Sequence, residues 1–306
     1  MSLARTILLR ASRSQWLAEQ FREREFARRA VRRFMPGEDL SAALDASAQL
    51  AAAGIGTVLT QLGEQVRSGA EAQAVRDHYF DVFDQLRERF LPTQLSVKLT
   101  HLGLDVGREA CARHVLALAA KAEEEGSFLW IDMEESRYVD LTLDIYRRAR
   151  AERGNVGVCL QAYLRRTPGD LATLLPLEPA IRLVKGAYKE PAAVAFPRKK
   201  DVDAQYVTLA GRLLDAAAAG RANPVFGTHD VRLLERIREQ AVGRRATGRF
   251  ETHMLYGIRS AEQRALAADG VKVRVLISYG RHWFAWYMRR LAERPANVWF
   301  VMRSLF

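Results

Sequence analysis

Short apolar runs alternate with amphipathic stretches over the last two thirds of the chain, and this alternation limits the possible folds most strongly. The runs have the length of β-strands, whereas the intervening stretches, for example residues 111–126 and 201–220, have helical periodicity. Alternation of this kind predicts parallel strands joined by crossover helices. Eight strands in about 210 residues match a (β/α)₈ barrel in size. The predicted strands lie at residues 94–99, 128–133, 156–162, 181–187, 223–230, 249–255, 271–278 and 297–302.

A doubly wound α/β sheet is the weaker alternative, because no glycine-rich phosphate-binding fingerprint follows a predicted strand. The nearest candidate, at residues 54–56, has Leu59 where a third glycine would stand, and no predicted strand precedes it. Residues 1–90 contain alanine-rich and charged stretches that we expect to be helical throughout. We therefore predict an α/β fold with an N-terminal helical region at residues 1–90 and a (βα)₈ barrel at residues 91–306.

The composition is that of a globular protein with a sizeable core, since 49% of the 306 residues are hydrophobic. No apolar stretch reaches the length of about 18 residues that a membrane-spanning helix needs. The first residues also lack the apolar core of a secretory signal. The only two cysteines, Cys111 and Cys159, lie far apart, which predicts neither a disulfide scaffold nor a zinc site. We expect a cytoplasmic protein.

The net charge is +11, with 47 basic and 36 acidic residues. An excess of this size indicates an anionic partner, such as a nucleic acid, a membrane surface or an acidic ligand. Much of the excess lies near the N-terminus, where residues 13–35 have the pattern of an arginine-rich amphipathic helix. Two interpretations remain open. The favoured one is a helix packed on the main domain, and the other is a patch attracted to anionic lipid or nucleic acid.

Polar side chains gather at the carboxyl ends of the predicted strands, which is where barrel enzymes build their active sites. A single polar residue there is usually a cap or a turn, but polar residues after six strands indicate one composite site. Arg182 lies at the start of its strand and joins that site only if its side chain points inward. The polar residues at the strand ends are Lys98, Asp132, Gln161, Lys185, Thr228, His229 and His253.

These residue types leave several reactions open. Lys98 and Lys185 could act as Schiff-base nucleophiles, or each could be held in a salt bridge, for example Lys98 with Asp132. The carboxylates of Asp132, Glu134 and Glu135 cannot all converge on a metal ion, because neighbouring residues of a strand face opposite ways. The histidines show no metal-binding spacing, so no metal site is predicted.

Adjacent arginines stand in the segment WYMRRLAE near the C-terminus. On a helix, the side chains of Arg289 and Arg290 point about 100° apart, so one small carboxylate lying across the helix could be held by both. Glu293 is within reach to orient either arginine. Together with Lys98, Arg182 and Lys185 these cations predict a ligand with carboxylate or phosphate groups. Gly186 and Ala187 follow Lys185 and would let such a ligand approach the backbone closely.

The order and spacing of these motifs resemble those of the proline dehydrogenase family, the flavoenzymes of proline catabolism, in its short bacterial form. The resemblance runs from about residue 92 to the C-terminus. It implies a distorted (βα)₈ barrel with FAD bound non-covalently at the carboxyl ends of the strands. The motifs that carry it are SVKLTHLG, WIDMEES, the glutamine of VCLQAYL, IRLVKGAYKEP, NPVFGTHD, FETHMLYG, RRLAE and FVMRSL.

The resemblance also implies roles for single residues. Arg289 and Arg290 would bind the proline carboxylate together with Lys98, and Glu293 belongs to the same substrate site. Asp132 is the acid near the substrate, where it would orient Lys98 or assist with the amine proton. Arg182 would lie near the N5 edge of the flavin. Leu183 and Tyr188 would line the cavity, and the FAD contacts would be Met133, Gln161, Arg182, Lys185, Gly186, Ala187, Thr228 and His229.

The reaction implied is the oxidation of L-proline to Δ1-pyrroline-5-carboxylate by hydride transfer to FAD, the first step of proline catabolism to glutamate. Electrons would pass to a quinone, and the basic chain would contact an anionic inner membrane peripherally. Nucleic acid is then not an expected partner. The residues alone leave two rivals: a Schiff-base lyase that uses Lys98 or Lys185, and a basic nucleic-acid-binding protein.

Two positions depart from the family pattern. Trp286 stands where a tyrosine usually lies three residues before the double arginine. Leu276 stands where a second active-site tyrosine is expected. These departures leave open the shape of the cavity and its selectivity against hydroxylated proline.

Overall fold

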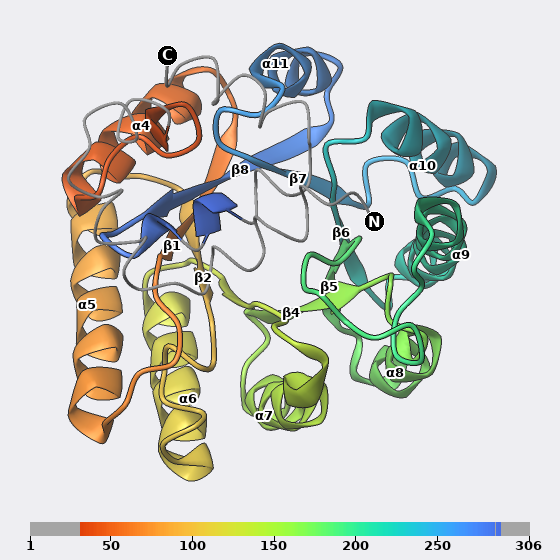
Figure 1. Cartoon of the computed structure of the whole chain (residues 1–306). Helices are drawn as coiled ribbons and strands as arrows, with labels where there is room; N and C mark the ends of the chain where they lie inside the picture. The colour runs from red at the N-terminus through yellow and green to blue at the C-terminus, as the bar shows by residue number, and fades with distance from the viewer. Residues whose placement is uncertain (1–30, 285, 289–306) are drawn as a thin grey trace, which may run out of the picture.

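The computed structural model describes residues 31–284 and 286–288, and Figure 1 shows helices surrounding a central barrel of strands. The strands are β1 (Gly56–Gln61), β2 (Thr93–Val97), β3 (Leu129–Ile131), β4 (Val156–Gln161), β5 (Ala180–Val184), β6 (Asn223–Gly227), β7 (Glu251–Leu255) and β8 (Lys272–Tyr279). The helices are α4 (Leu40–Ala52), α5 (Gly69–Glu88), α6 (Arg108–Glu124), α7 (Val139–Glu152), α8 (Thr167–Leu174), α9 (Lys199–Ala218), α10 (Val231–Gly243) and α11 (Ser260–Ala268), with 3₁₀ turns η1 (Ser136–Tyr138) and η2 (Leu175–Leu177).

All eight strands are parallel and form one closed barrel in chain order, which confirms the predicted fold class. The closure is made by β1 and β8, whose pairing extends from Gly56 opposite Arg274 to Gln61 opposite Tyr279. A closed barrel leaves no unpaired strand edge, so the backbone groups of each strand find partners on both sides.

The strand β1 corrects the prediction that residues 1–90 are helical throughout. It has the sequence GTVLTQ, is largely buried and pairs with both β2 and β8. The boundary drawn at residue 91 therefore falls inside the barrel. The run is short and lies between two helical stretches that contain alanine. Its β-branched residues, which favour a strand, were therefore assigned to the helical region. The predicted strand at residues 297–302 lies outside the described residues.

The side chains of the barrel strands alternate between two apolar layers, as parallel strands covered on both faces require. On one face, residues such as Leu95, Val158 and Ile181 belong to the large core cluster that includes the helices. On the other face, a smaller cluster fills the barrel interior and contains Val58, Trp130, Ala180 and Val225. This alternation decides which residues of a strand can reach the site.

Local sequence signals explain the helices around the barrel. The side chain of Ser68 accepts a hydrogen bond of 3.2 Å from the Glu71 N–H and so caps the start of α5. In α10, Leu233, Leu234, Ile237 and Ala241 are buried. Their spacing of three and four residues places them on the face that packs on the sheet.

The described end of the basic N-terminal segment packs against the chain after β8. Val31 and Met35 share a buried cluster with Trp283 and Tyr287, and the Trp283 indole N–H donates to Glu38 Oε1 at 2.9 Å. These contacts agree with the favoured interpretation of a packed helix, although most of residues 13–35 lies outside the described residues. In the part of the chain that the structure describes, no helix is long and apolar enough to cross a membrane.

Candidate active site

Arg182 is the centre of a charged network at the ends of three strands. Its side chain is 4% exposed, and its Nη2 donates to Ser96 Oγ at 2.7 Å and to Asp132 Oδ1. Ser96 Oγ in turn donates to Asp132 Oδ1 at 3.0 Å. Lys98 Nζ lies 3.7 Å from Asp132 Oδ2. The structure therefore brings together Lys98 directly after β2, Asp132 directly after β3, and Arg182 of β5, whose side chain meets the predicted condition of pointing inward.

Trp130 forms an aromatic floor beneath this network. The guanidinium carbon of Arg182 lies 5.1 Å from the centre of the Trp130 ring, within the range of a cation–π contact. The ring is held by a hydrogen bond of 2.7 Å from Trp130 Nε1 to Gln94 Oε1. Gly157 makes room for it, because a Cβ at that position would lie 2.5 Å from the ring. The arginine is thus fixed by a carboxylate, a hydroxyl and a ring.

The sequence reasoning missed Ser96 and Trp130, although a signal for both was present. Each stands two residues before a predicted site residue, Ser96 before Lys98 and Trp130 before Asp132. Because side chains of a strand alternate, residues two apart face the same side, and both residues are therefore expected to lie below the site.

A deeper polar layer lies below Trp130. The buried His253 meets the Trp130 ring edge-on at a centroid distance of 5.6 Å, and its Nε2 lies 3.4 Å from Glu251 Oε2. Arg274 Nε donates to the same carboxylate oxygen at 2.9 Å. Burial lowers the pKa of His253 to about 4, so the ring is neutral near pH 7. His253, which the sequence placed in the composite site, therefore lies under it as a neutral support.

Several buried polar atoms at the strand ends make no hydrogen bond within the described residues. Among them are Arg182 Nη1, a donor, and Gln161 Oε1, an acceptor, which lie on the neighbouring strands β5 and β4. The other atom of the Gln161 amide, Nε2, donates to the Met133 carbonyl at 3.2 Å and so orients the side chain. Because unpaired polar atoms are costly to bury, these two atoms indicate the place of a ligand with both an acceptor and a donor.

Lys185 is engaged by two carboxylates. Its Nζ donates to Asp203 at 2.6 Å and to Asp230 at 2.8 Å, and Lys199 Nζ contacts the same two groups. Burial acts to raise the pKa of Asp230, but its hydrogen bond to Lys185 and the charges of both lysines outweigh burial and lower that pKa to about 2. The salt-bridge alternative for Lys185 is therefore present in the structure.

The loops after β5 and β6 hold the remaining predicted cofactor contacts. Gly186 has a φ of +109°, and a Cβ there would lie 2.1 Å from the Tyr163 ring, so only glycine fits. Ala187 and Tyr188 follow it and are half-buried. After β6, Thr228 Oγ1 accepts from the Asp230 N–H at 3.2 Å, and His229 Nε2 accepts from the Leu255 N–H at 2.8 Å.

One predicted cavity residue conflicts with the structure. Leu183 is fully buried in the cluster shared with the helices, and its carbonyl accepts a hydrogen bond of 2.8 Å from the Tyr206 hydroxyl on α9. Because Arg182 points into the barrel, the next residue of β5 points outward. The prediction that Leu183 lines the cavity is therefore wrong.

Other predictions concern the chain at and beyond the end of the barrel. Leu276 packs against the interior cluster with Trp130, so that position does face the inside. Arg289, Arg290 and Glu293 lie outside the described residues, and their roles stay predictions. Among the residues that are described, no group of three or more His, Cys, Asp or Glu side chains could hold a metal ion.

Comparisons with known proteins identify the family. A family model described as proline dehydrogenase matches residues 43–303, a span that includes β1. The chain is 38% identical over 282 residues to a proline dehydrogenase of Deinococcus radiodurans, with 89% of each chain covered. It is 37% identical over 279 residues to proline dehydrogenase 1 of Bacillus subtilis subsp. natto, with 91% of each covered.

The solved structures add evidence about the fold. Proline utilization A (PutA) from Bdellovibrio bacteriovorus, inactivated by N-propargylglycine, matches with a TM-score of 0.81 at 22% identity, which shows a shared fold. The match covers 94% of this chain but only 38% of that one. The family model and the curated relatives together show that the chain belongs to the proline dehydrogenase family.

Proposed function

We propose that the chain oxidises L-proline to Δ1-pyrroline-5-carboxylate, with hydride transfer to a non-covalently bound FAD. Family membership supports this reaction. The observation that carries it is the network in which Asp132 and Ser96 hold Arg182 while Arg182 Nη1 is left for a ligand. An arginine fixed in this way can stabilise negative charge that develops during the reaction without reorganising.

The residues at the strand ends fit a flavin. The ring edge of a flavin offers hydrogen-bond acceptors and an N–H donor, which matches the unpaired Arg182 Nη1 and Gln161 Oε1. The positive φ of Gly186 keeps the backbone open to close approach. When bound, FAD would supply the group that accepts the hydride. We propose that it is held by Met133, Gln161, Arg182, Lys185, Gly186, Ala187, Thr228 and His229.

The substrate carboxylate requires cations, and Lys98 is the described residue best placed to bind it. Its ammonium lies 3.7 Å from Asp132, so the carboxylate of Asp132 orients the lysine and Arg182 together. Arg289 and Arg290, oriented by Glu293, are proposed to complete the clamp. Asp132 already accepts hydrogen bonds from Arg182 and Ser96, which favours an orienting role over transfer of the amine proton.

The Schiff-base alternative is not favoured by the arrangement of Lys185. Its Nζ would have to leave both Asp203 and Asp230 before it could attack a carbonyl. A lysine forms a Schiff base with an aldehyde or ketone, so borohydride reduction in the presence of a carbonyl substrate would trap such an adduct, and we expect no trapping.

The visible spectrum of the purified protein tests the proposal. A bound flavin gives a yellow protein with absorbance at about 450 nm, and anaerobic L-proline should bleach it as the flavin is reduced. D-proline is the control for the handedness of the site. A colourless protein that takes up no added FAD would refute the proposal, as would a yellow protein that L-proline does not bleach.

For the electron acceptor we propose a membrane quinone, reached by peripheral contact of the cytoplasmic protein with an anionic membrane. The net charge of +11 supports this contact, because basic segments are attracted to anionic lipid. Co-sedimentation with vesicles tests it. Binding should require anionic lipid and weaken with salt, whereas equal sedimentation with zwitterionic vesicles would contradict it.

A further inference from the structure

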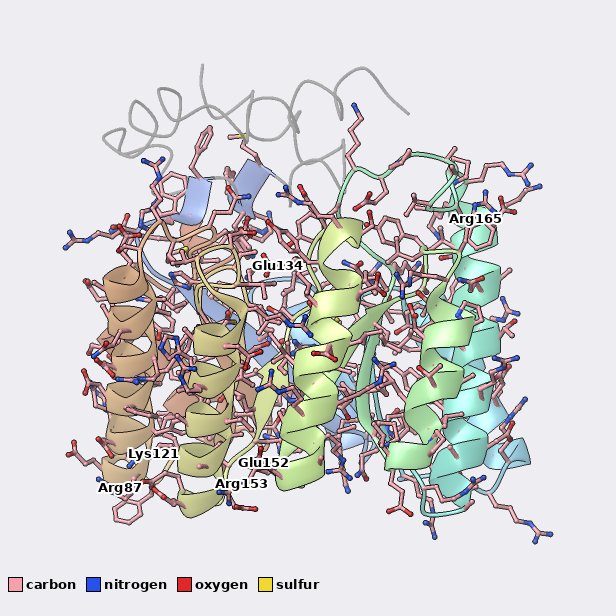
Figure 2. All side chains as sticks on the ribbon, turned by 90° about the horizontal axis from the view of Figure 1, so that it is seen from below. Arg87, Lys121, Glu134, Glu152, Arg153 and Arg165 are labelled. Atoms are coloured by element: carbon pink, nitrogen blue, oxygen red, sulfur yellow. The ribbon has the colours of Figure 1, made fainter. Side chains whose placement is uncertain are left out.

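Glu134 is a buried carboxyl group that the proposed mechanism does not use. It lies two residues after Asp132, its side chain is 4% exposed, and Figure 2 shows it toward the end of the barrel opposite Arg87 and Lys121. Both of its oxygens bind one residue of the loop after β2. Oε1 accepts from the Thr100 N–H at 3.0 Å, and Oε2 accepts from the Thr100 hydroxyl at 2.6 Å.

Thr100 belongs to the turn that begins at Lys98. The N–H groups of His101 and Leu102 both donate to the Lys98 carbonyl at 3.1 Å. The Thr100 carbonyl also accepts a bond of 3.3 Å from the Val66 N–H, in the loop after β1. Thr100 therefore joins the loops that follow three neighbouring strands, and Glu134 supplies the link from β3.

The turn has little space in which to shift. The His101 ring lies directly over Gly63, where an added Cβ would come within 2.1 Å of its Nε2. A turn packed in this way moves only if its hydrogen bonds break. Glu134 makes two of these bonds from the β3 side, both to Thr100.

Burial of a carboxyl group is costly, and here the hydrogen bonds that offset this cost all go to one residue, Thr100. The carboxyl group therefore acts on the position of Thr100. Asp132 holds the Lys98 ammonium from one side, and Glu134 holds the backbone that follows Lys98. We infer that Glu134 is a positioning residue, which fixes the turn at residues 98–102 so that Lys98 is presented to the substrate carboxylate. This inference rests on the proposed role of Lys98.

The test compares Glu134→Ala, Glu134→Gln and the matched control Glu135→Gln, which changes the neighbouring carboxylate that pairs with Arg137. Glu134→Ala removes both bonds to Thr100, so we expect the KM for proline to rise about tenfold with little change in kcat. The Kd of tetrahydrofuran-2-carboxylate, which has the ring and the carboxylate but no amine, should rise by the same factor. Flavin content should not change.

Glu134→Gln should rescue binding to within about threefold of the wild type, because an amide oxygen accepts from the Thr100 N–H and an amide N–H donates to its hydroxyl. Hydrogen exchange gives a readout that is independent of activity. The amides of His101 and Leu102 should exchange faster in Glu134→Ala than in the wild type or in Glu135→Gln.

Several outcomes would overturn the inference. One is a folded Glu134→Ala protein that equals Glu135→Gln in its KM for proline, its Kd for tetrahydrofuran-2-carboxylate and the exchange rates of the His101 and Leu102 amides. If Glu134→Ala does not fold, Thr100→Val can replace it, because this variant removes only the hydrogen bond from the Thr100 hydroxyl to Glu134. An unchanged Kd for tetrahydrofuran-2-carboxylate in Thr100→Val would equally contradict the inference. A wild-type protein that proline does not bleach would instead refute the proposed function, while the exchange measurement would still decide the role of Glu134.

Discussion

At the scale of single residues, the charge of Asp132 has the largest expected effect on the free energy of unfolding and on the rate of flavin reduction. It faces the buried Arg182 and lies near Lys98, so Asp132→Asn keeps the shape but leaves Arg182 without a counter-ion. Removing one partner of a buried pair costs about 3–5 kcal/mol, and we expect urea unfolding to show a loss of about that size. Flavin reduction by proline should slow by about a hundredfold in stopped flow.

The exposed pair between Asp45 and Arg89 is the matched control for Asp132. Asp45→Asn should change the free energy of unfolding by less than about 1 kcal/mol, because solvent screens such pairs. A loss in Asp132→Asn no larger than that in Asp45→Asn would show that the buried network is not held by charge.

The pH dependence of stability is the second expectation at this scale. Burial raises the pKa of Glu134 from 4.5 to about 7, and the nearby Glu64 adds to the effect, whereas the bonds from Thr100 and the charge of Lys98 oppose it. The folded protein thus binds this proton more tightly than the unfolded chain. The stabilisation that this bound proton provides is fully present below the pKa of Glu134 in the unfolded chain, and it is lost as the pH rises through about 7.

Glu134→Gln removes this titration. Relative to the wild type, the variant should therefore gain stability between about pH 5 and about pH 8, by up to about 3 kcal/mol. Guanidinium unfolding at a series of pH values measures the difference. Parallel curves for the two proteins would show that Glu134 does not titrate differently in the folded state.

At the scale of elements, the connection from β5 to α9 depends on one glycine. Gly186 has a φ of +109°, and a Cβ there would lie 2.1 Å from the Tyr163 ring. Gly186→Ala should destabilise the protein by about 2–4 kcal/mol through backbone strain and overpacking, and it should weaken retention of FAD.

Gly169 in α8 is the control, since a Cβ there meets nothing within 4 Å. Gly169→Ala should be neutral or stabilising by about 0.5–1 kcal/mol, because alanine favours a helix. Thermal melting and flavin release measure both variants. Equal melting temperatures would mean that the loop relaxes around the new methyl group.

At the scale of the whole molecule, closure of the barrel makes the N-terminal part indispensable. β1 pairs with β2 on one side and with β8 on the other, although the partner residues Leu59 and Ile277 are far apart in sequence. A chain that begins at residue 91 exposes the edges of β2 and β8, and exposed parallel edges associate with other chains. We expect that chain to aggregate and to show no cooperative melting transition in circular dichroism, unlike the full chain. A monodisperse fragment with a sharp transition would contradict this expectation.

The predicted site residues show which positions can be inferred from the two-residue periodicity of strands. The sequence placed Lys98 and Asp132 at strand ends and joined Arg182 to them on the condition that its side chain points inward, and the structure brings the three side chains together. The prediction that Leu183 lines the cavity came from the family resemblance, whereas the inward side chain of Arg182 places Leu183 on the outer face of β5. Which face of a strand points inward depends on the neighbouring strands and not on the residues of that strand alone.

The sequence by itself determined seven of the eight strands, the helices between them and the polar residues at the strand ends, because hydrophobic periodicity and β-branched content are local signals. It also carried enough ordered motifs to indicate the family. Only the tertiary structure decided that Gly56–Gln61 is a strand, that the Trp130 ring contacts the guanidinium of Arg182, and that Glu134 binds Thr100. Each of these depends on a partner from another strand, distant in sequence, which local sequence signals do not specify.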